Sequence, residues 1–226
     1  MRLLLVRHGA TANNAAGRFT GQTDSPMSAL GERQARALAA RLAPRQLDGV
    51  VSSDLQRASL LATAIAEAHG VPLRLDPALR EFAMGGWEGA TFAEIQAREP
   101  ERFQCWRDDP LNVAPPGGES VLQVRDRLVG ALDHCRAEYP DGTVLWVTHG
   151  GCIGVLLCHL LGVDPRRRWQ FRKDNAALSE IELGELPHSL ESAVIDPLSA
   201  TILRLNDTCH LDGMADSAAA ERFQVL

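Results

Sequence analysis

Apolar and polar residues follow one another along the chain in blocks whose periods predict alternating strands and helices. Short apolar runs, typical of strands buried on both faces, predict strands at residues 3–6, 50–51, 71–75, 143–147, 178–183 and 201–205. Apolar residues at helical spacing predict helices at residues 28–43, 55–69, 119–138 and from 152 onward. This alternation predicts an α/β fold, a three-layer α/β/α sandwich with a mostly parallel central sheet.

Two stretches interrupt the alternation and predict irregular structure. The polar, glycine-bearing segment from Asn13 to Pro26 predicts a long loop after the first strand. Residues 82–118 are rich in glycine and proline and predict only short helices, near residues 92–98 and 101–106. Since no repeat or linker divides the chain, we expect one domain over residues 1–211, with residues 82–118 as an excursion over the active site and residues 212–226 as a tail.

Charge and basic-residue usage narrow the function classes. The 226-residue chain has a formal net charge of −6, which argues against nucleic acid or an anionic membrane as the main partner. Lys173 is the only lysine among 23 basic residues, and no Gly-Lys-Ser/Thr motif occurs, so a P-loop NTPase is excluded. We assign Lys173 a structural role. The forked side chain of arginine suits phosphate better than an ammonium does, but composition alone does not identify which arginines bind one.

The cysteines and the apolar segments predict a cytoplasmic protein. Five cysteines, an odd number without a Cys-x-x-Cys pair, favour reduced thiols over a disulfide framework or a zinc site. The apolar run that precedes Arg7 is too short for a signal peptide. The longest apolar stretch, residues 152–163, contains His159 and is too short for a membrane span, so it predicts a buried helix. We therefore expect no membrane partner.

Ionisable residues follow four of the predicted strands or stand close to their ends. His8 follows the first strand and His149 follows the fourth, each directly before a glycine. Arg57 lies near the start of the helix after the second strand, and Glu81 lies just beyond the third. In open α/β sheets, ligands bind at the carboxyl ends of the strands. The sequence therefore predicts that these four side chains meet in one crevice.

Six motifs in this order identify a family resemblance. They are Leu5–Thr11, Arg18–Gly21, Ser52–Ala58, Glu81 with Gly86–Gly89, Gly117–Ser120 and Val147–Gly151. Together they resemble the histidine phosphatase superfamily, also called phosphoglycerate-mutase-like, over residues 1–211. The resemblance implies a phosphoglycerate-mutase-like fold and an enzyme that works through a phosphohistidine. The sequence departs from the common pattern at Ala10, where many members carry a carboxylate or glutamine.

The resemblance implies a role for each of five catalytic residues. His8 would be the nucleophile, because a neutral imidazole attacks phosphorus without first losing a proton. Arg7 and Arg57 would clamp the phosphoryl oxygens, and His149, when protonated, would add a third positive donor. Glu81 would protonate the ester oxygen and then activate water. These cations supply the charge compensation, so we expect neither a metal nor another cofactor.

Five further residues match substrate-binding positions of the family. Asn14 matches an asparagine that contacts the phosphate, and Thr20 and Gly21 match a loop that lines the substrate site. Gly150 follows His149 in its motif. His210 matches a terminal segment that helps bind substrate in some phosphatase branches.

Three functions are weighed on this basis. The first is a metal-independent phosphomonoester hydrolase acting on a small phosphorylated metabolite of the α-ribazole phosphate, phosphoserine or sugar phosphate class. Residues 81–89 and 117–120 resemble α-ribazole phosphatases, whereas residues 169–176 and 205–211 resemble metal-independent phosphoserine phosphatases. The alternative is a cofactor-dependent phosphoglycerate mutase, but the short stretch around Glu81 favours the phosphatase branch. A non-catalytic binding protein of the same fold is least favoured, because His8, Arg57, Glu81 and His149 are all present. A homodimer is a possible assembly.

Overall fold

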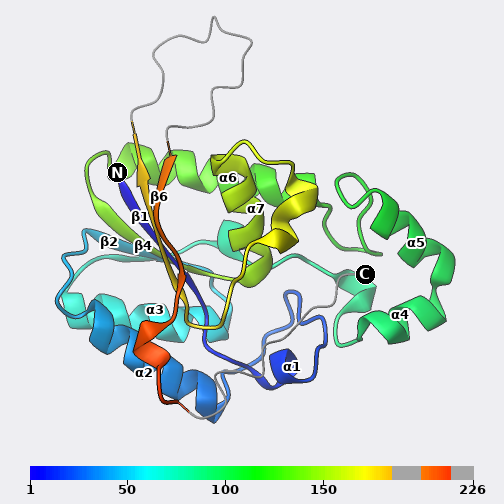
Figure 1. Cartoon of the computed structure of the whole chain (residues 1–226), viewed down its shortest axis with the longest axis horizontal. Coiled ribbons are helices and arrows are strands. Elements are labelled where there is room, and N and C mark those ends of the chain that lie inside the picture. The colour runs from blue at the N-terminus through cyan, green and yellow to red at the C-terminus, as the bar shows by residue number, and fades with distance from the viewer. Residues whose placement is uncertain (185–199, 215–226) are drawn as a thin grey trace, which may run out of the picture.

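The computed structural model describes residues 1–184 and 200–214 and contains a six-stranded sheet within them (Figure 1). The strand order is β3-β2-β4-β1-β5-β6. β1 pairs in parallel with β4, β4 with β2 and β2 with β3, whereas β5 pairs antiparallel with β1 and β6 pairs antiparallel with β5. The mostly parallel sheet predicted from the sequence is therefore confirmed. The strands are β1 (Arg2–Arg7), β2 (Gly49–Ser52), β3 (Leu73–Leu75), β4 (Thr143–Thr148), β5 (Leu178–Leu183) and β6 (Ala200–Asp207).

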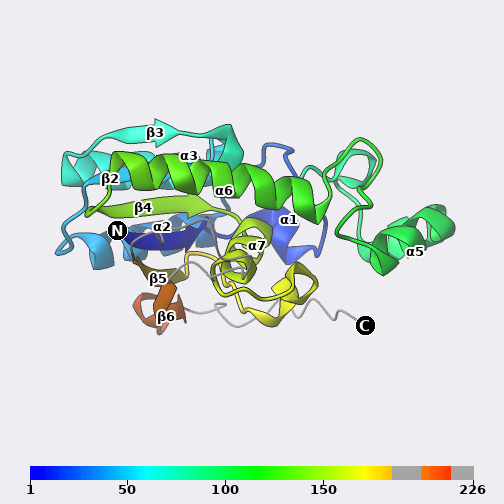
Figure 2. The same cartoon turned by 90° about the horizontal axis from the view of Figure 1, so that it is seen from above.

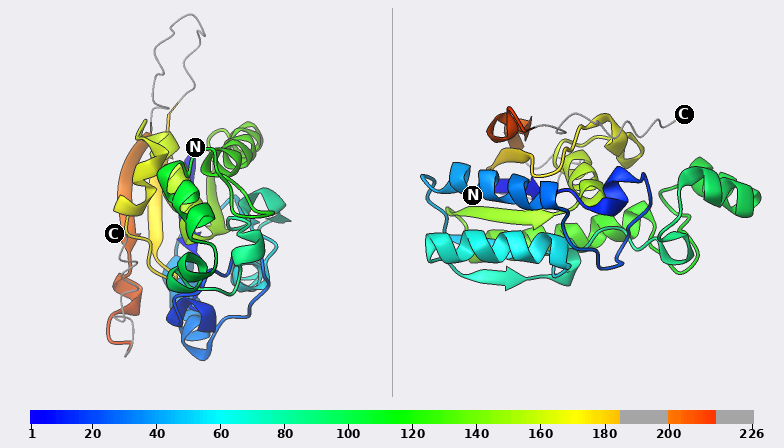
Figure 3. Two further views of the ribbon diagram at one scale, coloured as in Figure 1. Left: turned by 90° about the vertical axis from the view of Figure 1, so that its right-hand side faces the viewer. Right: turned by 90° about the horizontal axis from the view of Figure 1, so that it is seen from below.

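Helices cover both faces of the sheet, which confirms the three-layer architecture (Figures 1 and 3). Leu3 and Leu5 of β1 pack into a cluster with α6 and α7, while Leu4 and Val6 pack with α2 and α3. Alternate residues of one strand thus enter opposite cores, which is why residues 3–6 of β1 are all apolar. The four helices are α2 (Ala29–Leu42), α3 (Gln56–His69), α6 (Val121–Glu138) and α7 (Gly150–Leu160).

The excursion after β3 forms a separate aromatic cluster beside the sheet (Figures 1 and 2). Trp87, Phe103 and Trp106 are buried there, and the rings of Trp87 and Trp106 meet edge to face at 5.5 Å. The helices of this region are α4 (Phe92–Arg98) and α5 (Pro100–Asp108), close to the short helices predicted. Short 3-10 turns lie at η1 (Pro77–Leu79), η2 (Gly85–Trp87), η3 (Pro165–Gln170) and η4 (Cys209–Leu211).

The segment predicted as a loop from Asn13 to Pro26 begins instead with a short helix, α1 (Ala12–Ala15). Thr11 and Asn14 form a capping box that stabilises its first turn, a local signal that the polar composition concealed. Most of the predicted tail, residues 215–226, lies outside the described residues. Within the described ranges no helix could span a bilayer, and all five cysteines are free thiols.

Candidate active site

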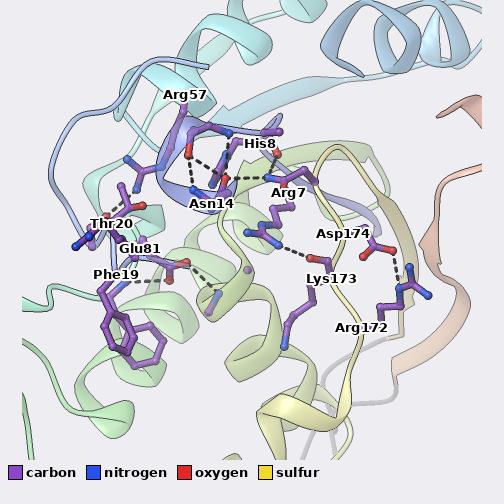
Figure 4. A pocket seen from close by; sticks show the side chains of 18 of the residues that line it. Arg7, His8, Asn14, Phe19, Thr20, Arg57, Glu81, Arg172, Lys173 and Asp174 are labelled. Atoms are coloured by element: carbon purple, nitrogen blue, oxygen red, sulfur yellow. Dashed lines mark hydrogen bonds and ion pairs between the residues drawn. The ribbon is translucent and has the colours of Figure 1, made fainter. Parts of the chain in front are cut away.

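A cavity of about 1350 Å³ opens where β1 and β4 end and α7 begins (Figure 4). Its wall includes four of the five predicted catalytic residues: Arg7, His8, Arg57 and Glu81. The fifth, His149, is fully buried behind the wall, with its ring centroid 5.1 Å from that of His8. The structure therefore brings together the side chains that the sequence placed at separate strand ends.

His8 is held as a neutral imidazole with one nitrogen committed to the backbone. Its Nδ1–H donates to the carbonyl of Gly9 at 2.7 Å, so the lone pair lies on Nε2. Burial, together with the charges of Arg7 and Arg57, lowers the pKa of His8 well below its usual value. The ring is only 4% exposed, yet it lines the cavity. A buried neutral imidazole with a free lone pair fits a nucleophile.

His149 is a neutral imidazole that accepts a hydrogen bond at Nδ1 and donates one at Nε2. Arg57 donates its Nε–H to His149 Nδ1 at 3.3 Å, and His149 Nε2–H donates to the Ser53 hydroxyl at 2.9 Å. Burial and the neighbouring His8 and Arg57 lower its pKa well below the usual value. The protonated form that the resemblance implies would need a nearby dianion to reverse this shift.

The two predicted clamp arginines are fixed by backbone carbonyls. Arg57 is 1% exposed and donates to the carbonyls of Gly21 at 2.7 Å and Thr23 at 2.9 Å. Arg7 donates to the carbonyl of Lys173 at 2.6 Å. Gly150 permits this position of Arg7, because a Cβ at residue 150 would lie 3.3 Å from the Arg7 Nε. Fixed guanidinium groups of this kind suit a phosphoryl group.

Glu81 lies against the first turn of α7. Its Oε2 accepts the Gly151 N–H at 3.0 Å and its Oε1 accepts the Phe82 N–H at 3.0 Å. A Cβ at residue 151 would lie 2.4 Å from Oε1, so only glycine allows this approach. The nearby Cys152 is a thiol, because burial and the charge of Glu81 raise its pKa to about 12. Glu81 therefore faces the cavity from a defined position, where a proton donor or acceptor could act.

A partly buried ion pair supports the segment that carries Glu81. Arg127 of α6 donates to both oxygens of Glu119, at 2.8 and 2.9 Å, and to the carbonyls of Ala78 at 2.6 Å and Glu81 at 3.2 Å. Glu119 also accepts the Ala83 N–H at 2.9 Å. Glu119, the acidic residue of the motif at residues 117–120, thus acts with Arg127 to fix the backbone before and after Glu81. Nothing in the sequence pattern singled out Arg127.

A sequence model described as the histidine phosphatase superfamily (branch 1) matches residues 3–195. The chain belongs to this superfamily. The family resemblance seen in the sequence and the expectation of an enzyme of the histidine phosphatase type are thereby confirmed.

Individual relatives of this histidine phosphatase carry several names. Phosphoserine phosphatase 1 of Hydrogenobacter thermophilus is 36% identical over 211 residues, covering 93% of this chain and 94% of its own. A probable phosphoglycerate mutase of Yersinia enterocolitica is 37% identical over 217 residues, covering 94% and 95%. The crystal structure of the α-ribazole phosphatase from Shigella flexneri superimposes with a TM-score of 0.79, at 28% identity, covering 92% and 97%. The names agree on small phosphorylated substrates and differ on which one.

Asn14 and the loop before β5 hold the end of β1 in the histidine phosphatase. Asn175 donates to the carbonyl of His8 at 3.0 Å and to Asn14 Oδ1 at 3.3 Å. The N–H of Ala176, whose φ of +56° is unusual for alanine, contacts the carbonyls of Arg7 at 2.9 Å and His8 at 3.1 Å. In the described chain the Asn14 amide nitrogen donates to no protein group, so it can serve a ligand. The resemblance at residues 169–176 did not indicate that Asn175 and Ala176 hold the end of β1.

The other predicted substrate-binding residues divide into two groups. Thr20, Gly21 and Gly150 line the cavity, and the buried Thr20 hydroxyl has no hydrogen-bond partner within the described ranges. His210 does not line it: its Nε2–H donates to the Ala176 carbonyl at 3.0 Å, and its Nδ1 accepts from Arg41 at 3.0 Å. His210 therefore supports the backbone behind β1, and its predicted contact with substrate stays a prediction.

The rest of the cavity has two walls of different character. Phe19, Phe82, Met84 and Trp106 line an apolar wall next to the aromatic cluster. Residues 168–175 line a polar wall on the opposite side of β1 from β4. In the parts of the chain that the structure describes, no group of three His, Cys, Asp or Glu side chains could hold a metal ion.

Proposed function

We propose that this histidine phosphatase hydrolyses small phosphomonoesters through a phosphohistidine formed on His8. The observation that carries the proposal is the state of the His8 ring. Its Nδ1–H is bound to Gly9, its Nε2 lone pair is free, and two guanidinium groups stand beside it in the cavity. This combination suits attack on a phosphoryl dianion, since the arginines offset the charge that otherwise repels a nucleophile.

The proposed reaction has two balanced steps. In the first, His8 Nε2 bonds to phosphorus as the bond from phosphorus to the ester oxygen breaks, and a protonated Glu81 gives its proton to the leaving alkoxide. In the second, the Glu81 carboxylate takes a proton from water as the water oxygen attacks phosphorus. The phosphorus–nitrogen bond breaks, phosphate leaves, and His8 and protonated Glu81 are restored. Asn14 Nδ2 and the guanidinium groups of Arg7 and Arg57 would hold the phosphoryl oxygens throughout.

The size of the cavity favours hydrolysis over mutase activity. A mutase must keep water from the phosphohistidine while its intermediate reorients, which needs a site closed around the substrate. A cavity of about 1350 Å³ exceeds the usual range for a small-molecule pocket and leaves room for water beside a small phosphomonoester. The relatives named phosphoserine phosphatase and α-ribazole phosphatase support the same choice.

The test of the proposal is loss of both turnover and labelling in His8→Ala. The wild type should hydrolyse p-nitrophenyl phosphate and become labelled, from a phosphorus-labelled substrate, with an acid-labile, alkali-stable phosphoryl group. His8→Ala should lose both signals, whereas His134→Ala, an exposed histidine on α6, should keep them. Full turnover by His8→Ala would overturn the proposal, and so would a label that persists in it. A mutase assay on 3-phosphoglycerate, run beside it, should show phosphate release and not isomerisation.

Activity should also survive incubation with EDTA, because the proposed mechanism draws its positive charge from arginines. An activity that EDTA removes and a divalent cation restores would show that a metal takes part.

A further inference from the structure

The only lysine of the chain lies in the polar wall of the cavity. The Lys173 ammonium donates to the carbonyl of Arg168 at 2.8 Å and lies 5.5 Å from the centre of the Trp169 ring. Within residues 1–184 and 200–214 it forms no ion pair with a carboxylate. The adjacent Arg172 differs, because its Nε is 2.7 Å from the Asp174 carboxylate (Figure 4).

An ammonium group in such a position is costly for the fold. Burial lowers the pKa of Lys173 to about 8, and the positive charge of Arg7 acts in the same direction, whereas Glu81 opposes it. Charged residues of the cavity therefore influence the pKa of Lys173. A methionine of similar length could fill the same space beside Gly154 without a desolvation penalty, so packing alone does not account for a cation here.

The surrounding structure makes room for the ammonium itself. A Cβ at residue 154 of α7 would lie 3.1 Å from the Lys173 Nζ and 2.8 Å from the carbonyl that it contacts. Lys173 is also tied to the phosphoryl side of the cavity, because its own carbonyl accepts the hydrogen bond from Arg7. A ligand held by Arg7 thus begins next to the backbone of Lys173, whose side chain extends from there toward Gly154 of α7.

We propose that Lys173 binds a carboxylate of the substrate, which makes the substrate a phosphomonoester that also carries a carboxylic acid. The inference rests on the proposed function and adds the substrate class to it. One compact ammonium balances one negative charge, so it matches a carboxylate, while the two clamp arginines match the phosphoryl dianion. A bound carboxylate would supply the counter-ion that the described protein groups do not provide.

A matched pair of substrates tests the proposal in the wild type. 3-Phosphoglycerate and glycerol 3-phosphate differ only in whether the carbon that ends the chain is a carboxylate or a hydroxymethyl group. We expect kcat/KM to be about 10- to 100-fold higher for 3-phosphoglycerate, which is the range for one charge-assisted hydrogen bond. Phosphoserine and phosphoethanolamine form a second pair, in which the carboxylate is replaced by hydrogen, and the preference should recur there. Equal kcat/KM values within both pairs would overturn the proposal.

Lys173→Met then identifies the group responsible. It should lose about 10- to 100-fold in kcat/KM on the two carboxylate substrates and less than about threefold on their partners. The control is Arg167→Met, which removes the same charge from an exposed residue of η3 outside the cavity and should leave both ratios unchanged. An equal loss on both members of a pair, or a preference that persists in Lys173→Met, would overturn the assignment.

Failure of this inference can be told from failure of the proposed function. Hydrolysis of p-nitrophenyl phosphate, which has no carboxylate, reports the phosphatase reaction alone. If His8-dependent turnover of that ester is present while the substrate pairs show no preference, only the carboxylate site is wrong. If Lys173→Met does not fold, as judged by circular dichroism, the ratios of the wild type still decide.

Discussion

Replacing Arg127 should lower kcat/KM more for esters whose leaving group must be protonated than for esters whose leaving group is stable as an anion. Arg127 is not among the residues that line the cavity; it fixes the backbone carbonyl of Glu81 and, through Glu119, the N–H of Ala83. Arg127→Met keeps most of the side-chain volume and releases these contacts. The proposed acid then loses its defined position, and a displacement of about 1 Å can cost roughly 100-fold in rate.

The stability cost of the same substitution can be worked from the ion pair. Breaking a buried pair by removing one partner costs about 3–5 kcal/mol. The side chains of Arg127 and Glu119 are 18% and 21% exposed, so water offsets part of that loss, and we expect about 2–3 kcal/mol. For a domain of this size that corresponds to a fall of roughly 5–10 °C in Tm. Arg125→Met, on the same helix but in an exposed pair with its neighbour Asp126, should change Tm little.

The assay compares kcat/KM for two esters, because this parameter reports the first step, in which the leaving group departs. p-Nitrophenolate is a stable leaving group and needs little protonation, whereas the alkoxide of glycerol phosphate needs a proton. Arg127→Met should therefore lose about 100-fold on glycerol phosphate and less than about tenfold on p-nitrophenyl phosphate. Equal losses on the two esters in a folded variant would refute the positioning of Glu81 by Arg127.

Further predictions concern the first turn of α7 and the two buried histidines. Gly151→Ala places a Cβ 2.4 Å from the Glu81 carboxylate and should lower kcat/KM on alkyl phosphates by about 100-fold. Gly130→Ala serves as the control, because a Cβ at this position of α6 meets open space. It should stabilise the protein by about 1 kcal/mol, as measured by urea unfolding. Folding lowers the pKa of His8 and His149, so the unfolded chain binds more protons below about pH 6.5. The free energy of unfolding should therefore fall as the pH drops from 7.5 to 5.5, by up to about 1.4 kcal/mol per pH unit for each histidine. His8→Asn should weaken this pH dependence. An unchanged pH dependence in His8→Asn would contradict the lowered pKa of His8.

The elements that the sequence predicted well are those specified by local patterns. The run from Leu3 to Val6 is apolar at every position because both faces of β1 are covered, and this alone indicates a central strand. Ser28 caps α2 and Gly70, with a φ of +64°, ends α3, both as the residue types predict. The motifs at the strand ends likewise indicated His8 and Glu81, since the carboxyl ends of parallel strands meet at one edge.

What the sequence did not reveal depends on contacts between distant residues. Arg127 is one of three arginines in α6, and only the folded chain places it against Glu81, 46 residues earlier. Asn175 supports β1 from 167 residues away, and the sequence marked it only as part of a stretch, residues 169–176, that resembles phosphoserine phosphatases. Lys173 was assigned a structural role, whereas the structure places it among the residues that line the cavity.

The central position of β1 has a consequence for how the protein is made. Leu4 is paired on one side with Leu145 and on the other with Glu180, so the first strand to leave the ribosome has no partner until most of the chain exists. Four consecutive apolar residues stay unpaired during that interval, which makes the nascent chain prone to aggregation and suited to chaperone binding. The carbonyls of Arg7 and His8 likewise meet their donor only when residue 176 has been added. The strand that carries the proposed nucleophile is thus synthesised first and fixed in place late.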